Sequence, residues 1–219
     1  MRLVIFDVDG TLVDSQADII ASMHAAFDDQ DLTPPMRTDI LGIVGLSLDV
    51  AMHRLAPEAD NARLVQAYKD SYAELRQAGG AASSPLYRGA REMLDQLRGR
   101  GDLMLGVATG KSKRGLDSLI KVHGLSGLFD TRQVADFHPS KPHPSMIHTA
   151  LAETGVAGGN AVMIGDTSFD MDMAQAAGVP GIGVTWGYHP RENLGSARQI
   201  IDDFADLPAA LDAVWSDQT

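Results

Sequence analysis

Short runs of consecutive apolar residues recur along the chain and alternate with segments of helical periodicity. The clear runs are LVIF (3–6), LMLGVA (103–108), AVMIG (161–165) and GIGV (181–184), and a weaker one is QVADF (133–137). Unbroken hydrophobicity is typical of strands that are covered on both faces, as in a parallel sheet. These runs therefore predict the strands of such a sheet.

The segments between the later runs are predicted to be helices. Apolar residues recur three or four positions apart in three segments that precede glycines, namely 90–97 before Gly99, 116–120 before Gly124 and 146–151 before Gly155. This spacing puts apolar side chains on one helix face, and glycine is common at helix ends. Alternating strands and helices predict an α/β fold with a doubly wound, Rossmann-like parallel sheet.

One long interval, 15–85, contains no convincing strand. Its helical signals are two series with helical spacing, Ile19, Met23 and Phe27, and then Leu64, Tyr68, Tyr72 and Leu75. The SQAD sequence at its start predicts a capping box from Ser15 to Asp18. We therefore predict a helical insertion at 15–85 within a core domain formed by 1–14 and 86–219.

Composition narrows the classes of partner. The 219 residues are 44% hydrophobic and 21% charged, with a formal net charge of -11 and no cysteine. The negative charge argues against nucleic acid and acidic membrane surfaces as partners, and it is compatible with a divalent cation. Without cysteine there is no disulfide, no thiolate zinc site and no thiol nucleophile, which suits a reducing compartment.

Apolar segment lengths bear on location. The first run, 3–6, is too short for a signal-peptide core, and no later run approaches the length of a membrane span. We expect a cytoplasmic protein.

Two aspartates, Asp7 and Asp9, directly follow the first apolar run. Side chains two positions apart on an extended chain point the same way, about 6.6 Å apart. Ligands of open parallel sheets bind at the carboxyl ends of the strands, where this pair falls. The two carboxyl groups can therefore reach one small reacting group, although aspartates next to glycine and threonine also build turns and helix caps.

The second run ends in Thr109 and Gly110. The hydroxyl and the amide of these residues are suited to holding phosphate oxygens at the start of the next helix. The alternative for Thr109 is an ordinary hydroxyl at a strand end. Gly106 and Gly110 are one residue too close for the GxxxxGK[ST] pattern of nucleotide-binding loops. Lys111 and Lys113 are expected to lie in solvent.

Further acids and a lysine follow the later runs. Asp166 ends the run 161–165, and Asp170 lies one helical turn on. Carboxylate oxygens are the ligands that Mg²⁺ prefers, although Asp166 could instead cap a helix. Asp172 is expected to face solvent. Lys141 stands in HPSKPHP, where prolines stiffen the loop, and it can pair with charge opposite these aspartates.

Histidines 138 and 143 flank Lys141. The two histidines lack HExxH-like spacing and cysteine partners, which favours a role in packing the loop over metal binding.

Four segments in order, DVDGT (7–11), ATGK (108–111), SKPHP (140–144) and GDTSFD (165–170), resemble the four motifs of the haloacid dehalogenase superfamily. The helical insertion resembles the small cap of that superfamily. Within it the chain is most similar to the phosphoglycolate phosphatase group, including the VTWGY stretch at 184–188.

The resemblance implies a role for each motif residue. Asp7 would be the nucleophile that forms an aspartyl-phosphate, and Asp9 would protonate the leaving alcohol and then deprotonate water. Mg²⁺ would be bound through Asp7, Asp166 and the backbone carbonyl of Asp9. The transferring oxygens would be bound by Thr109, Gly110 and Lys141, and Asp170 would orient Lys141 or a metal-bound water.

The implied function is Mg²⁺-dependent hydrolysis of a small-molecule phosphomonoester, phosphoglycolate-like in kind. A β-phosphoglucomutase-like phosphosugar mutase or sugar phosphatase would keep the same motifs. Asp9 argues against dehalogenation, and Asp9 and the cap together argue against a receiver-like phospho-acceptor. A receiver-like phospho-acceptor and a non-catalytic binding module would both show no turnover. The sequence indicates no oligomeric state.

Specificity is expected in the cap. The GIVGLS stretch (42–47) is a candidate substrate loop. Arg37 or Arg54 could meet a substrate carboxylate, or lie on a solvated helix face. Beyond the cap, Trp186, Tyr188 and His189 could line the mouth of the cleft or anchor the C-terminal segment.

Overall fold

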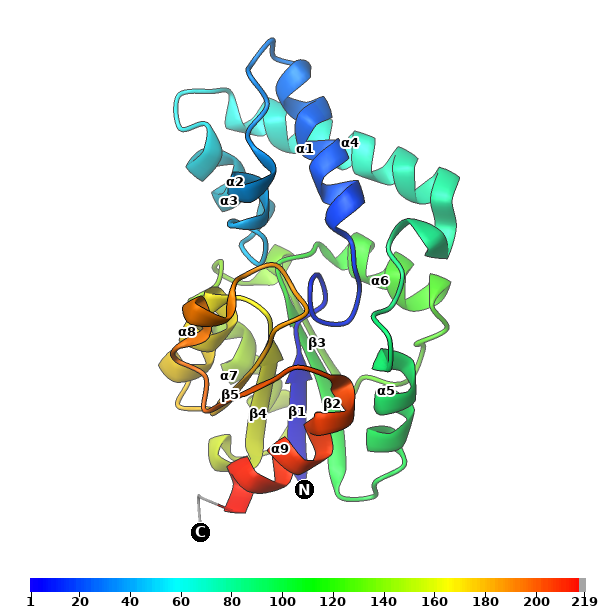
Figure 1. Cartoon of the computed structure of the whole chain (residues 1–219), viewed down its shortest axis with the longest axis vertical. Coiled ribbons are helices and arrows are strands. Elements are labelled where there is room, and N and C mark those ends of the chain that lie inside the picture. Colours follow the sequence, from blue (N-terminus) through cyan, green and yellow to red (C-terminus); the bar gives the residue numbers. More distant parts are fainter. Residues whose placement is uncertain (217–219) are drawn as a thin grey trace.

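The computed structural model describes residues 1–216 and contains one sheet of six strands (Figure 1). The strands are β1 (Arg2–Phe6), β2 (Leu103–Thr109), β3 (Thr131–Val134), β4 (Ala161–Gly165), β5 (Gly181–Val184) and β6 (Gln199–Ile201). Their order is β3-β2-β1-β4-β5-β6, and every adjacent pair is parallel. The predicted parallel sheet is confirmed, with β1 at its centre.

Helices cover both faces of the sheet. They are α5 (Ala90–Arg98), α6 (Lys113–Val122), α7 (Ser145–Thr154), α8 (Ser168–Ala176) and α9 (Leu207–Ser216). Val4 and Phe6 of β1 join the core under α5, α6 and α9, whereas Leu3 and Ile5 join the core under α7 and α8. Because side chains alternate along a strand, continuous apolar runs supply both cores, and the doubly wound α/β prediction is confirmed.

Two strands differ from the sequence-based prediction. The weak run at 133–137 is a strand only to Val134, because 135–137 turn into a short 3₁₀ helix. Asp136 of that turn accepts a hydrogen bond from the backbone N–H of Lys113, which ties it to the start of α6. The edge strand β6 was missed because three residues are too few to show a pattern.

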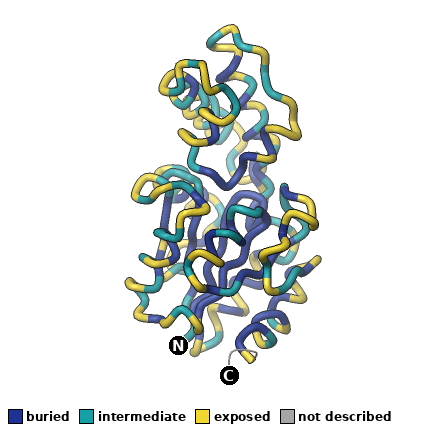
Figure 2. Tube along the Cα trace, turned by 90° about the vertical axis from the view of Figure 1, so that its left-hand side faces the viewer, coloured by how far each residue is buried: buried dark blue, intermediate teal, exposed yellow. Residues whose placement is uncertain are grey.

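Four helices stand above the carboxyl ends of the strands: α1 (Gln16–Asp28), α2 (Arg37–Leu41), α3 (Leu48–Leu55) and α4 (Asn61–Gly79) (Figure 1). We call them the cap. They enclose a separate apolar core that includes Met23, Phe27 and Met52, and Figure 2 shows buried segments both here and around the sheet. The domain boundaries at 14/15 and 85/86 stay a prediction. No described helix, at residues 1–216, is long and apolar enough to cross a membrane.

The predicted capping box at the start of α1 is wrong. Ser15 precedes the helix, but its side chain accepts no hydrogen bond from the helix backbone. Its Oγ donates instead to Asp9 Oδ1 at 2.5 Å, and Asp18 accepts a hydrogen bond from Ser84 Oγ at 3.1 Å. Both polar side chains therefore serve the junction between cap and core rather than the helix.

The stretch 42–47 docks the cap on the core. The backbone N–H of Ser47 donates to Ser140 Oγ at 2.8 Å. A Cβ at Gly110 would lie 2.5 Å from the carbonyl oxygen of Leu46 and 2.7 Å from that of Gly45. Because real Cβ atoms do not approach backbone oxygens so closely, only glycine at position 110 allows this contact.

We expect the substitution Gly110→Ala to push the stretch 42–47 away from the core. Hydrogen exchange at the Ser47 amide should then accelerate by about tenfold or more, because local opening removes its protection. Gly115→Ala on α6 is the control, since its Cβ would meet nothing closer than Ser112 Oγ at 3.3 Å. Unchanged exchange at Ser47 in the Gly110 variant would mean that the close approach does not hold the cap.

Candidate active site

The ends of β1 and β4 bring three predicted site residues together. Carboxyl oxygens of Asp7, Asp166 and Asp170 lie within 4.8 Å of one another, and all three residues are buried. Asp7 follows β1, Asp166 follows β4, and Asp170 lies in the first turn of α8. Parallel neighbours end at the same edge of a sheet, and this register joins residues more than 150 positions apart.

Lys141 lies inside this acidic cluster. Its Nζ is 2.8 Å from Asp7 Oδ1 and 2.6 Å from Asp170 Oδ1, and its side chain is 0% exposed. Burial by itself lowers the pKa of Lys141, but the charges of Asp170 and Asp7 outweigh it and raise that pKa above its usual value. Lys141 is therefore a buried ammonium group that bridges the end of β1 and the start of α8.

Helix α8 starts with a true capping box. The Thr167 side chain accepts from the Asp170 backbone, and Asp170 Oδ2 accepts from the Thr167 backbone N–H at 3.1 Å. The helix cap is thus Thr167, and the alternative role of Asp166 as that cap is wrong. Asp166 instead accepts hydrogen bonds from Thr11 Oγ1 at 2.9 Å and from the Tyr188 N–H at 2.8 Å.

The cluster carries more negative than positive charge. Three carboxylates and one ammonium group leave a formal charge of -2. Burial raises the pKa of Asp7 to about 7, against the opposing charge of Lys141. Burial, followed by the charge of Asp170, raises the pKa of Asp166 well above its usual value.

Asp7 Oδ2 provides a test of whether this site fits a metal. It is buried and has no hydrogen-bond partner within residues 1–216. A divalent cation would supply the missing partner and offset the excess charge, and its hard character matches carboxylate oxygens. The residues present therefore fit such an ion.

Asp9 is held separately from the cluster. Lys111 Nζ lies 2.8 Å and 3.0 Å from its two carboxylate oxygens, and Ser15 Oγ donates to Oδ1. The expectation that Lys111 lies in solvent is wrong. Its side chain is only 10% exposed, and its Nζ also donates to the hydroxyl of Tyr72 on α4 at 3.0 Å.

The error for Lys111 has a physical cause. The local sequence does not show that α4 passes above the end of β2. A lysine that directly follows Thr109 and Gly110 is therefore predicted to lie at the surface. Tyr72 lies over Lys111, with Nζ 4.8 Å from the ring centroid, and shields it from water. Lys113, in contrast, is 59% exposed and pairs with Asp117, as expected for a solvated lysine.

A cavity of about 600 Å³ separates the cap from the strand ends. Asp7, Asp9, Thr109 and Gly110 line it together with residues 43–47 of the candidate substrate loop. Thr109 is 1% exposed, and its Oγ1 accepts the Lys111 N–H at 3.2 Å. Thr109 and Gly110, two of the predicted phosphate-binding residues, thus face the same space as Asp7 and Asp9, whereas the third, Lys141, does not line this cavity.

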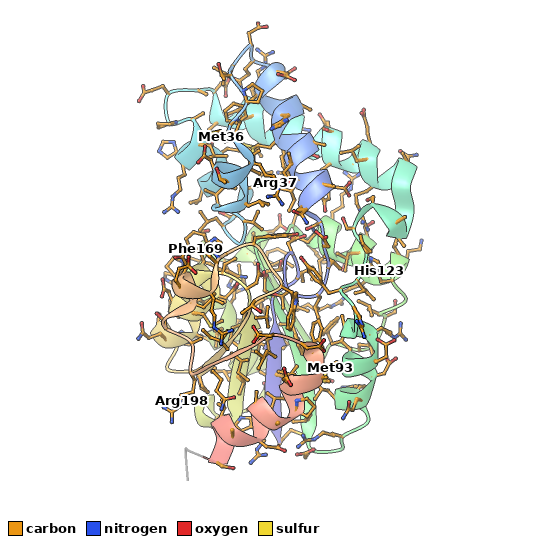
Figure 3. All side chains as sticks on the ribbon, viewed as in Figure 1. Met36, Arg37, Met93, His123, Phe169 and Arg198 are labelled. Carbon is orange, nitrogen blue, oxygen red and sulfur yellow. The ribbon has the colours of Figure 1, made fainter. Side chains whose placement is uncertain are left out.

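Arg37 and Arg54 do not line this cavity. Arg37 donates a hydrogen bond to Gln16, and the Arg54 guanidinium lies 5.5 Å from the ring centroid of Phe169. Figure 3 shows Arg37 among the cap helices and Phe169 at the edge of the core that faces the cap. The cavity is instead lined by four other cationic side chains, from Lys69, Arg76, Lys111 and Arg114.

The residues after β5 serve as anchors. Trp186 Nε1 donates to the Thr11 carbonyl at 3.0 Å, and its ring centroid lies 4.5 Å from that of Phe204. Tyr188 contacts both the cap and the acidic cluster, which the sequence did not predict. Its Oη accepts a hydrogen bond from the Ser15 N–H at 2.9 Å, and its own N–H donates to Asp166. His189 is 7% exposed and accepts the Ser168 N–H at 3.2 Å.

Two further expectations concern single side chains. Both ring nitrogens of His138 form hydrogen bonds, to Ser145 Oγ at 2.8 Å and to Gln133 Oε1 at 2.9 Å, so this histidine packs the loop as predicted. Asp172 is partly rather than fully exposed, and it accepts a hydrogen bond from Ser196 at 3.0 Å.

The comparisons with known proteins agree with this arrangement. Residues 4–184 match the family model described as haloacid dehalogenase-like hydrolase. The chain is 36% identical over 218 residues to the "Probable phosphatase IndB" of Dickeya dadantii, covering 97% of this chain and 94% of that protein. It is 33% identical over 219 residues to a phosphoglycolate phosphatase of Agrobacterium fabrum, covering 95% and 91%.

Solved structures share the same fold. A haloacid dehalogenase-like family hydrolase from Streptococcus pneumoniae superposes with a TM-score of 0.82 at 26% identity, covering 96% of this chain and 98% of that one. The match of the family model over most of the chain, together with relatives of similar length, establishes the family. This protein belongs to the haloacid dehalogenase-like hydrolases.

Proposed function

We propose that this protein is a Mg²⁺-dependent phosphomonoester hydrolase that acts on a small phosphorylated metabolite through an aspartyl-phosphate on Asp7. The observation that carries the proposal is the unpaired Oδ2 of Asp7 in a buried cluster with Asp166, Asp170 and Lys141. The names of relatives such as the Agrobacterium fabrum phosphoglycolate phosphatase support a phosphatase. The cytoplasmic location expected from the sequence stays a prediction.

The residues proposed to hold Mg²⁺ are Asp7, Asp166 and the backbone carbonyl of Asp9. When bound, the ion would offset the carboxylate charge and polarise a phosphoryl oxygen. Thr109, Gly110 and Lys141 are proposed to bind the oxygens of the transferring group. A buried ammonium group suits the charge that develops on those oxygens in the transition state.

The chemistry of the chain's own residues follows in two steps. The Asp7 carboxylate attacks phosphorus, and the bond from phosphorus to the leaving oxygen breaks as the new bond forms. Asp9 donates a proton to that oxygen, so that the alcohol leaves neutral. Asp9 then takes a proton from a water molecule, which attacks phosphorus and releases inorganic phosphate and free Asp7.

The contacts of Asp9 fix the orientation of its carboxyl group. Lys111 contacts both carboxylate oxygens and Ser15 donates to one of them, so the carboxyl group has little freedom to turn. Lys111 is proposed as a positioning residue that acts through Asp9. Since Tyr72 of the cap also holds Lys111, the proposed acid is placed by contacts that form when the cap is docked.

The first test uses p-nitrophenyl phosphate with Mg²⁺. We expect wild-type protein to hydrolyse it and Asp7→Asn to lose activity by about 10³-fold or more, because the amide is a poor nucleophile. The control is Asp172→Asn on α8, which removes one carboxylate outside the cluster and should retain activity. Equal inactivity of wild type and Asp7→Asn would overturn the proposal and favour a binding or receiver-like role.

The same assay separates the phosphatase from a phosphomutase. A phosphatase releases inorganic phosphate from a panel of metabolites that includes 2-phosphoglycolate, sugar phosphates and pyrophosphate. A mutase would convert one sugar phosphate into its isomer and release little phosphate. If the isomer forms faster than phosphate is released, the protein is a phosphomutase and the proposed hydrolase function is wrong.

Metal binding can be measured without turnover. A ligand at about 100 times its dissociation constant stabilises the folded state by about 2.7 kcal/mol. For a protein of this size we expect Mg²⁺ to raise Tm by about 5 °C over the chelated protein. Asp166→Asn should abolish the shift, whereas Asp172→Asn should keep it. The same shift in all three proteins would mean that the ion binds elsewhere.

The role of Lys111 predicts a dependence on the leaving group. We expect Lys111→Met to reduce kcat for an alkyl phosphate by about tenfold or more, because a displaced Asp9 delivers its proton poorly. The loss should be smaller for p-nitrophenyl phosphate, whose leaving group needs little proton donation. Lys113→Met, which alters an exposed lysine nearby, is the control. Equal losses for both substrates would contradict a role through Asp9.

A further inference from the structure

The cavity under the cap is much larger than a two-carbon alcohol requires. Its volume of about 600 Å³ corresponds to about twenty water molecules at roughly 30 Å³ each. The glycolate part of phosphoglycolate has only five non-hydrogen atoms and would leave most of this space to water. Residues 43–47 of the docked stretch already line the cavity, so the space persists with the cap in contact with the core.

The wall of this cavity above the strand ends is largely apolar. Ile19 and Met23 of α1 line it together with Val65, Tyr68 and Tyr72 of α4. The two tyrosine rings are stacked, with centroids 5.8 Å apart and planes inclined by 15°. Aromatic and aliphatic side chains that line a ligand cavity favour an apolar ligand of matching size.

Cationic side chains gather around the same space. Lys69 and Arg76 come from α4 on the cap side, and Lys111 and Arg114 come from the core side. One guanidinium nitrogen of Arg76, Nη2, is buried and has no hydrogen-bond partner within residues 1–216. Lys111 is already paired with Asp9, so Lys69, Arg76 and Arg114 are the cations of this cavity that remain for a ligand.

Four acids and four cations line the cavity, but within residues 1–216 none of the four acids forms an ion pair with Lys69, Arg76 or Arg114. Besides Asp7 and Asp9, the lining acids are Asp49 and Asp136. Asp49 accepts a hydrogen bond from Asn61 at 2.7 Å, and Asp136 accepts one from the Lys113 N–H. Because Lys141 already serves the phosphoryl site, the cations of α4 and α6 are left to meet charge elsewhere on the ligand.

We propose that the substrate is a phosphomonoester whose alcohol part is an apolar group of ring size that carries a second negative charge. The ring lies against Tyr68 and Tyr72, and the second charge is met by Arg114, Lys69 and Arg76. This inference rests on the proposed phosphatase function and names its substrate class.

A matched series of substrates tests the inference. The three compounds are 3-carboxyphenyl phosphate, phenyl phosphate, which lacks the second charge, and 2-phosphoglycolate, which lacks the ring. We expect kcat/KM for 3-carboxyphenyl phosphate to exceed that for either other compound by about tenfold or more. A preference for 2-phosphoglycolate, or equal values for all three, would overturn the inference.

Substitutions distinguish the ring contact from the charge contact. Arg114→Ala should reduce kcat/KM for 3-carboxyphenyl phosphate by about tenfold and for phenyl phosphate by less than about twofold. The control is the neighbouring Lys113→Ala, which removes a cation outside the cavity and should change neither value. Tyr68→Ala should lower the values for both aryl phosphates and spare 2-phosphoglycolate.

If Arg114→Ala lowers kcat/KM equally for both aryl phosphates, the cations act only on the phosphate group. That result would overturn the proposed contact with a second charge. Calorimetry with the Asp7→Asn variant separates the inference from the proposed function. Binding of 3-carboxyphenyl phosphate about tenfold tighter than 2-phosphoglycolate supports the ligand class even if wild type hydrolyses nothing. Equal binding of the two compounds overturns it even if wild type is an active phosphatase.

Discussion

The site depends on one buried ion pair network, in which the Lys141 ammonium group lies between Asp7 and Asp170 with no exposure to water. Buried carboxylates are costly unless they are paired and hydrogen-bonded. Lys141 offsets part of that cost, and the capping box of α8 fixes Asp170 so that it can hold Lys141. The remaining negative charge and the unpaired Asp7 oxygen are what make the cluster suited to a divalent cation.

A second polar network joins the cap to the core at Asp9. Lys111 contacts Asp9 and Tyr72, whereas Ser15 contacts Asp9 and Tyr188, whose N–H binds Asp166. Ser15, which precedes α1, therefore contacts Asp9 directly, and α4 contacts it through Tyr72 and Lys111. The same residues hold the cap on the core and orient the proposed acid. Ser15 donates its hydroxyl hydrogen bond to Asp9 and therefore does not cap α1.

The cavity combines the two features on which recognition rests. Asp7, which contacts Lys141, and Asp9 line its floor at the strand ends, and its walls carry apolar cap residues and cations from both α4 and α6. A floor of this kind suits phosphoryl chemistry in general, and the walls decide which alcohol fits. In the proposed function, the strand ends would therefore set the reaction class, and mainly the cap would set the choice of substrate.

The sequence by itself determined the parallel sheet, the helices on its two faces and the helical segment between β1 and the rest, because buried runs and helical periodicity are local patterns. It also identified Asp7, Asp9, Thr109, Lys141, Asp166 and Asp170 as residues at strand ends or in short motifs. Only the tertiary structure decided the roles of Lys111, Ser15, Tyr72 and Tyr188, whose partners lie up to 173 positions away. Local pattern carries no information on which distant side chain will cover a lysine or accept a serine proton, because packing of the cap on the core decides it.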